Sequence, residues 1–201
     1  MIVAIHGFFG RPEDWDFLRH AGLDVQAFPL DEIPPSGDVL LGYSMGGRLA
    51  LQALLDGARY NRAVIVSAGL GGADAGRRAA DEAWARRFES DRWETLVADW
   101  EAQPLFGGHT MNRRESDFDR AALASALRRH SPAVLPPLRP RLHEIAIPLL
   151  WIAGERDRKY VGVAQEAVAL LPNAELWICP GAAHRVPWEQ PHSFVRRLQA
   201  L

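Results

Sequence analysis

One short stretch limits the choice of fold more than any other part of the chain. Residues 42–46 read Gly-Tyr-Ser-Met-Gly and lie directly between an apolar run typical of a buried strand, 39–41, and a run typical of a helix, 49–55. Because no ordinary loop fits there, we expect Ser44 in a tight strand-to-helix turn with its hydroxyl group at the end of a sheet. The free N–H groups at the start of the helix that follows Ser44 stabilise a negative charge that develops near the serine hydroxyl group. A turn that merely contains serine fits the same pattern, so the interpretation depends on partner residues elsewhere.

Apolar runs of strand length recur along the chain and alternate with stretches of helical spacing. The predicted strands cover residues 2–5, 23–28, 39–41, 63–67, 147–153 and 174–179. Strands that alternate with helices in this way form a mainly parallel, doubly wound sheet. We therefore expect a fold of the α/β class.

Residues 70–142 differ in composition from the sequence on either side. They contain no convincing strand and are rich in alanine, arginine and acidic residues, with aromatic residues such as Trp84 and Phe88 at helical intervals. Sheet-type sequence resumes afterwards. We therefore predict a helical cap inserted into one α/β core, which consists of residues 1–69 and 143–201.

Composition excludes several classes of protein. The formal charge is −2, with 23 basic and 25 acidic residues, so the composition does not indicate a basic surface that binds nucleic acid. No apolar run reaches membrane-spanning length and the apolar start lacks a basic leader, so we expect a cytoplasmic monomer or small homo-oligomer without a membrane partner. Cys179 is the only cysteine, and no histidine pair has metal-ligand spacing beside a carboxylate, so we expect no metal.

Three predicted strand ends carry the residue types of a nucleophile, an acid and a base. They occur in the order Ser44, Asp157, His184, and parallel strands bring their carboxyl ends to one edge of the sheet. Serine needs an imidazole to take its proton, and the imidazole needs a carboxylate to fix its tautomer and orientation. We expect the backbone N–H groups of Phe8 and Met45 to form an oxyanion hole.

Two of these assignments have competitors. Glu155 lies two residues before Asp157, and the strand-end position favours Asp157. Only His184 follows a glycine-rich turn after the last predicted strand. The other histidines fall beside the first strand, in the predicted cap or in helices: His6, His20, His109, His130, His143 and His192.

Taken together, these features resemble the α/β-hydrolase superfamily over nearly the whole chain. Four stretches are more specific: residues 42–48 (GYSMGGR), 84–88 (WARRF), 98–106 (ADWEAQPLF) and 154–159 (GERDRK). In these stretches the chain is similar to the family of 2-succinyl-6-hydroxy-2,4-cyclohexadiene-1-carboxylate synthases of menaquinone biosynthesis. The resemblance implies a carbon–oxygen lyase whose triad eliminates pyruvate from a cyclohexene polycarboxylate, with no metal or organic cofactor.

A substrate with several carboxylates implies arginines in its pocket. Arg48 lies one helical turn after Ser44 and can border the site. The resemblance also implies that Arg77 binds substrate and that Tyr43 and Trp100 line the site. A further cap arginine has three candidates, Arg113, Arg114 and Arg120. Most cap arginines are expected on solvated helix faces, balanced by nearby acids.

The chain departs from this family in one region. The strands that usually precede the first one here, and the Pro-Gly-His-Gly loop with its following helix, have no counterpart, and residues 28–32 with a proline-rich link stand in their place. We therefore expect a reduced sheet of about six strands and one rebuilt pocket wall. The same triad fits a carboxylesterase or thioesterase that forms an acyl-enzyme on Ser44, and a noncatalytic ligand-binding relative is a third hypothesis.

Overall fold

Six apolar segments form one parallel sheet in the computed structural model, which describes residues 1–201. The strands are β1 (Ile2–Ile5), β2 (Val25–Phe28), β3 (Ser36–Tyr43), β4 (Arg59–Val66), β5 (Leu149–Gly154) and β6 (Ala174–Cys179). They are ordered β2-β1-β3-β4-β5-β6, and every neighbouring pair is parallel. All six carboxyl ends therefore lie at one edge. The predictions of an α/β fold and a sheet of about six strands are confirmed.

The chain divides into two units. The first contains Met1–Leu70 and Leu138–Leu201 and holds the whole sheet, and the second is Gly71–Pro137. Leu70 and residues 138–142 were predicted to belong to the helical insertion, but the structure groups them with the sheet. Leu138 and Leu142 are buried in the core beside the strands, which explains the difference.

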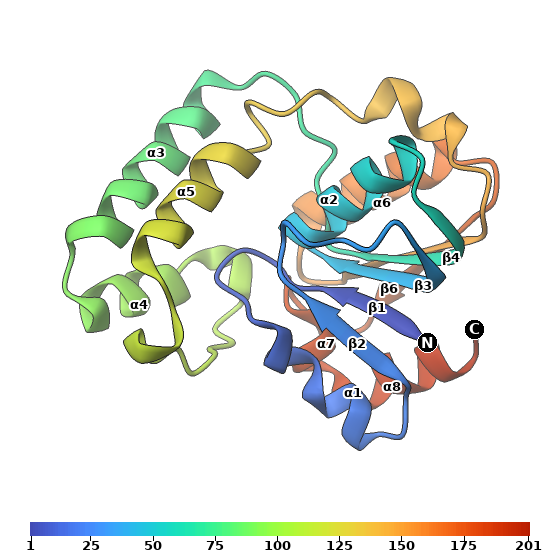
Figure 1. Ribbon diagram of the computed structural model, residues 1–201, viewed down its shortest axis with the longest axis horizontal. Helices are drawn as coiled ribbons and strands as arrows, with labels where there is room; N and C mark the ends of the chain where they lie inside the picture. Colours follow the sequence, from blue (N-terminus) through green and yellow to red (C-terminus); the bar gives the residue numbers. More distant parts are fainter. The chain divides into compact units, whose positions relative to one another are not determined.

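Helices cover both faces of the sheet (Figure 1). One face carries α2 (Met45–Leu55) and α6 (Arg158–Leu170), with the 3-10 helix η4 (Arg139–Glu144). The other carries η1 (Pro12–Trp15), α1 (Asp16–His20), α7 (Val186–Glu189) and α8 (Pro191–Gln199). Alternate strand residues point to opposite faces, so Val3 packs in the first core and Ala4 in the second. The sheet is therefore packed between two apolar layers, which fix the positions of the carboxyl ends of its strands.

The connection from β2 to β3 is unusually short. Residues 29–35 carry the chain past β1, whereas a parallel crossover normally spans a dozen or more residues with a helix. Leu30 and Ile33 pack against the core, and the Tyr60 hydroxyl group donates to the Pro34 carbonyl at 2.7 Å. A proline-rich link thus takes the place of a crossover helix.

The second unit is helical. It contains α3 (Ala75–Ser90), α4 (Trp93–Glu101) and α5 (Arg120–His130), with the 3-10 helices η2 (Pro104–Phe106) and η3 (Glu115–Asp117). The carboxylates of Asp74 and Asp119 cap α3 and α5 by accepting backbone N–H groups of the first turn. These caps satisfy donors that an isolated helix end leaves exposed.

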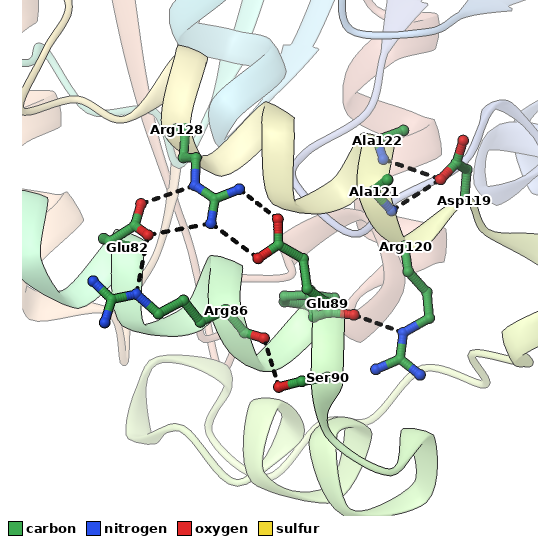
Figure 2. A network of polar contacts seen from close by, with 10 residues as sticks. Glu82, Arg86, Glu89, Ser90, Asp119, Arg120, Ala121, Ala122 and Arg128 are labelled. Atoms are coloured by element: carbon green, nitrogen blue, oxygen red, sulfur yellow. Dashed lines mark hydrogen bonds and ion pairs between the residues drawn. The ribbon is translucent and has the colours of Figure 1, made fainter.

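An ion-pair network joins α3 to α5 (Figure 2). The Arg128 guanidinium donates from Nε to Glu82 at 2.9 Å and from Nη2 to Glu89 at 3.0 Å, and Arg86 also donates to Glu82. All four side chains are at least partly exposed, so each pair contributes little alone. The helices α3 and α5 pack against each other, and each has buried apolar residues, such as Phe88 on α3 and Leu127 on α5.

Candidate active site

Ser44 occupies the predicted strand-to-helix turn. It joins β3 to α2 with φ 51° and ψ −114°, a conformation that non-glycine residues seldom adopt. A Cβ added at Gly46 would lie 2.1 Å from the His6 carbonyl oxygen, and one at Gly42 would lie 2.6 Å from the Gly47 Cα. The flanking glycines are therefore required by close backbone approach.

Ser44, His184 and Asp157 form a continuous hydrogen-bonded chain. The Ser44 Oγ lies 2.9 Å from His184 Nε2, and His184 Nδ1 lies 2.6 Å from Asp157 Oδ2. Only 1 % of the His184 side chain and 4 % of the Asp157 side chain are exposed. With Nδ1–H donating to the carboxylate, Nε2 is left to accept the serine proton. The structure thus brings together the three residues that the strand ends predicted.

Burial sets the electrostatics of this imidazole. Desolvation lowers the pKa of His184, and the hydrogen bond to Asp157 acts in the opposite direction. Burial disfavours the charged form of a base, so a lowered pKa keeps His184 neutral near pH 7. A neutral imidazole beside a serine hydroxyl group is the form that acts as a general base.

Aromatic rings pack around His184. The Tyr160 ring meets the imidazole edge-on at a centroid distance of 4.5 Å, and the Tyr43 ring lies at 5.5 Å. Tyr43 also packs edge-on against Trp188 at 4.8 Å, and burial raises the pKa of its hydroxyl group. Tyr160 and Trp188 were not among the site residues predicted from the sequence. The position of Tyr160, one turn into the helix that Asp157 caps, was the available signal.

The turn that follows β1 runs beside the serine. A Cβ added at Gly7 would lie 3.2 Å from the Ser44 Cβ, so the next residue, Phe8, belongs to backbone that borders the site. Met45 is the first residue of α2. Met45 thus follows Ser44 directly and Phe8 follows the glycine that approaches it, while their role in an oxyanion hole stays a prediction.

Arg48 is buried one turn beyond Ser44 in α2. Its side chain is among the largest fully buried ones, with 2 % of the residue exposed, and its backbone N–H donates to the Ser44 carbonyl at 3.0 Å. Burial lowers the pKa of Arg48 to about 10, which leaves the guanidinium charged at neutral pH. A buried positive charge is therefore carried by the residue one helical turn after the serine.

Arg77 and Trp100 lie in the second unit, so their part in a site with Ser44 stays a prediction. The Arg77 Nε donates to both carboxylate oxygens of Asp81 at 2.8 Å, and Asp81 also accepts from the Ser131 hydroxyl group at 2.6 Å. Trp100 packs edge-on against Trp84 at 5.0 Å. The three other candidate arginines have these neighbours: Arg113 contacts Met111, Arg114 pairs with Asp117, and Arg120 donates to the Phe88 and Asp91 carbonyls.

No group of three or more histidine, cysteine, aspartate or glutamate side chains is placed to hold a metal ion. None of the helices has the length and apolar character needed to cross a membrane.

The fold and this triad geometry define a class of protein. A family model described as the alpha/beta hydrolase family matches residues 3–197, and the chain therefore belongs to that family. Within it, the chain belongs with proteins named 2-succinyl-6-hydroxy-2,4-cyclohexadiene-1-carboxylate synthase. The relative from Salmonella typhimurium is 34% identical over 243 positions, which cover 100% of this chain and 92% of the relative. The relative from Shigella flexneri is 28% identical over 238 positions, with the same coverage.

Solved structures show the same fold. MenH from S. aureus superposes with a TM-score of 0.84 at 24% sequence identity, over 99% of this chain and 91% of that one. A thermophilic esterase from Thermogutta terrifontis gives a TM-score of 0.79 at 16% identity, over 99% and 88% of the two chains. The architecture is thus shared by a synthase and by an esterase, and the fold alone does not select the reaction.

Proposed function

We propose that this enzyme is a carbon–oxygen lyase that eliminates pyruvate from a polycarboxylate cyclohexene intermediate of menaquinone synthesis. The observation that carries the proposal is the full-length relationship to proteins named as that synthase, combined with the Ser44–His184–Asp157 chain of hydrogen bonds. The buried charge of Arg48, one turn from Ser44, supports an anionic substrate.

The proposed reaction begins with proton removal from a carbon next to a carbonyl or conjugated carboxylate group. The neutral imidazole of His184 takes the proton by way of the Ser44 hydroxyl group, while Asp157 stabilises the imidazolium that forms. The electron pair left on carbon is delocalised onto oxygen, where the N–H groups of Phe8 and Met45 stabilise the enolate-like charge. That electron pair then moves to break the carbon–oxygen bond, and the leaving group takes up a proton and tautomerises to pyruvate.

Arg48 has a separate role in this proposal. A guanidinium group presents paired donors that match a carboxylate, and a partly dehydrated setting strengthens such contacts. The buried position of Arg48 holds that charge on a rigid helix instead of a mobile loop. We therefore expect it to position one substrate carboxylate while the triad moves the proton.

The proposal is tested by supplying the pathway intermediate to the purified protein and following pyruvate. We expect pyruvate release that Ser44→Ala abolishes. Ser67→Ala is a matched control, because Ser67 is a buried serine with a positive φ at the end of the adjacent strand β4. Rapid cleavage of simple esters without any pyruvate would overturn the proposal.

A carboxylesterase or thioesterase is the second candidate function. The 2.9 Å contact between Ser44 Oγ and His184 Nε2 favours it, because the same contact activates a serine for attack on an acyl group. A fluorophosphonate adduct on Ser44 would show that the serine is nucleophilic under either proposal. Turnover of short acyl esters, with accumulation of an acyl-enzyme, would select this second function.

A further inference from the structure

One buried carboxylate outside the triad contacts the backbone on both sides of His184. Glu189 ends α7, and 5 % of its side chain is exposed. Its Oε2 accepts the N–H of Ala183 at 2.7 Å and its Oε1 accepts the N–H of Arg185 at 2.8 Å. A single carboxylate thus holds the two peptide N–H groups that flank the imidazole.

The same carboxylate reaches the loop that carries the acid. Arg156, the residue before Asp157, donates from Nη2 to Glu189 Oε2 at 3.0 Å. Its backbone N–H also donates to the Ala182 carbonyl at 2.8 Å. Glu189 therefore links the histidine loop to the residue adjacent to the triad aspartate.

The loop of residues 155–157, which follows β5, contacts the loop of residues 180–185, which follows β6, at several points. The Glu155 carboxylate accepts the Gly181 N–H at 2.9 Å, and the Glu155 N–H donates to the Cys179 carbonyl at 3.0 Å. A Cβ added at Gly154 would lie 1.9 Å from the Ala183 carbonyl oxygen. The backbone of one loop thus leaves no space for movement of the other toward it.

We propose that Glu189 is a positioning residue, which fixes the His184 loop so that the imidazole meets Asp157 and Ser44 at hydrogen-bond distance. This inference rests on the proposed triad chemistry. A carboxylate only accepts hydrogen bonds, so it matches two N–H groups and a guanidinium at once. A glutamine amide would turn a donor toward one of these donors, and that contact would be lost.

The negative charge of Glu189 also acts on the imidazole. The other groups around His184 are the Ser44 hydroxyl group, the carboxylate of Asp157, the guanidinium of Arg185 and the rings of Tyr43 and Tyr160. Asp157 and Glu189 raise the pKa of the imidazole, whereas burial and Arg185 lower it. Loss of the Glu189 charge should therefore move the acid limb of the activity profile to lower pH.

The test compares Glu189→Gln with Glu144→Gln, a matched change of an exposed carboxylate on η4. The first measurement is the rate at which a fluorophosphonate labels Ser44, and the second is the downfield proton signal of His184 Nδ1–H. We expect Glu189→Gln to slow labelling by between about tenfold and a hundredfold and to shift or weaken the proton signal. Glu144→Gln should match the wild type in both.

A purely structural role for Glu189 would change the unfolding midpoint while folded molecules keep the wild-type labelling rate and proton signal. That result overturns the proposal. Arg156→Ala should slow labelling less than Glu189→Gln does, because 53 % of the Arg156 side chain is exposed and both N–H contacts remain. Where pyruvate release is measurable, kcat should fall and KM should stay close to the wild-type value.

Hydrogen exchange on the wild-type protein tests the proposal without any variant. The N–H groups of Ala183 and Arg185 should exchange as slowly as those within β5 and β6, and fast exchange at both positions would contradict the inference. None of the labelling, proton-signal or exchange measurements needs pyruvate release. Absence of pyruvate from the wild type would therefore reject the proposed function and leave the role of Glu189 to be decided by these measurements.

Discussion

Ser44 and Ser67 end adjacent parallel strands with nearly the same φ, 51° and 48°. The Ser44 N–H donates to the Val66 carbonyl and the Ser67 N–H donates to the Ile152 carbonyl, each at 2.8 Å. Each turn is thus fixed by the next strand in the sheet. The hydroxyl groups differ, because that of Ser44 lies at hydrogen-bond distance from His184, while that of Ser67 is buried without a hydrogen-bond partner.

This difference predicts opposite effects of the same substitution. Ser67→Ala removes a buried hydroxyl group that makes no hydrogen bond, so the free energy of unfolding should stay within about 1 kcal/mol of the wild type or rise. Ser44→Ala should abolish fluorophosphonate labelling and keep the fold. Denaturant titration and labelling of both variants check the prediction, and a loss of several kcal/mol in Ser67→Ala would contradict it.

The lowered pKa of His184 predicts a pH profile. The ordinary pKa of a histidine is 6.5, and burial lowers it here despite Asp157 and Glu189, with Arg185 acting in the same direction as burial. The neutral base should therefore persist as the pH falls through ~6.5, and the rate should decline only at lower pH. Initial rates of Ser44 labelling across this range measure the effect. An acid limb centred above pH ~6.5 would show that the pKa of His184 is not lowered in the folded protein.

The same shift links stability to pH. The unfolded chain binds a proton at His184 at higher pH than the folded chain does. The contribution of His184 to the free energy of unfolding is therefore complete above pH ~6.5 and is lost as the pH falls through the lower folded-state pKa. Urea unfolding should show that the wild type loses more stability than His184→Gln between about pH 7 and pH 5.

Arg48 predicts a separation between binding and triad chemistry. Arg48→Met removes the buried charge, so the KM for the polycarboxylate substrate should rise about tenfold or more, since a hydrogen bond to a charged group contributes about 1.5–3 kcal/mol. Arg48→Lys keeps a positive charge but lacks the planar guanidinium group, so its KM should lie between those of the wild type and Arg48→Met. Labelling of Ser44 by a neutral fluorophosphonate is the control. If Arg48→Met lowered the labelling rate as much as it weakened substrate turnover, Arg48 would stabilise the Ser44 turn and would not bind the substrate.

Gly154 predicts a large stability difference between two glycine substitutions. Gly154→Ala places a Cβ 1.9 Å from the Ala183 carbonyl oxygen, so it should cost about 1–3 kcal/mol or more and separate the two site loops. Gly162→Ala is the matched control, because an added Cβ in that turn of α6 meets nothing within 4 Å. It should stabilise the protein by about 0.5–1 kcal/mol. Thermal unfolding of both variants measures the contrast.

The sequence predicted the triad positions because parallel strands place their carboxyl ends together, whatever the details of packing. Ser44, Asp157 and His184 each follow a strand, so their order along the chain was sufficient. The six-stranded α/β sheet followed from the same alternation of apolar runs and helices. Neither prediction depended on knowing side-chain conformations.

Glu189 could not be predicted in this way. It lies five residues beyond His184, and only the path of the short helix α7 turns its carboxylate back to the N–H groups beside the imidazole. The pairing of Arg77 with Asp81 follows from helical spacing, but the contact of Asp81 with Ser131 joins residues far apart in the chain. Contacts of this kind are set by tertiary packing, which residue spacing alone does not specify.

The short link between β2 and β3 separates the strands whose ends carry site residues from an outer strand that carries none. The site residues of the first unit follow β1, β3, β5 and β6, whereas the link of residues 29–35 leaves an outer strand that carries none of them. The crossover helix can therefore be omitted while the triad distances stay intact. For protein engineering, we expect a binding segment inserted between the exposed residues Asp31 and Glu32 to leave the ends of β3, β5 and β6 unchanged, provided that Leu30 and Ile33 keep their core contacts.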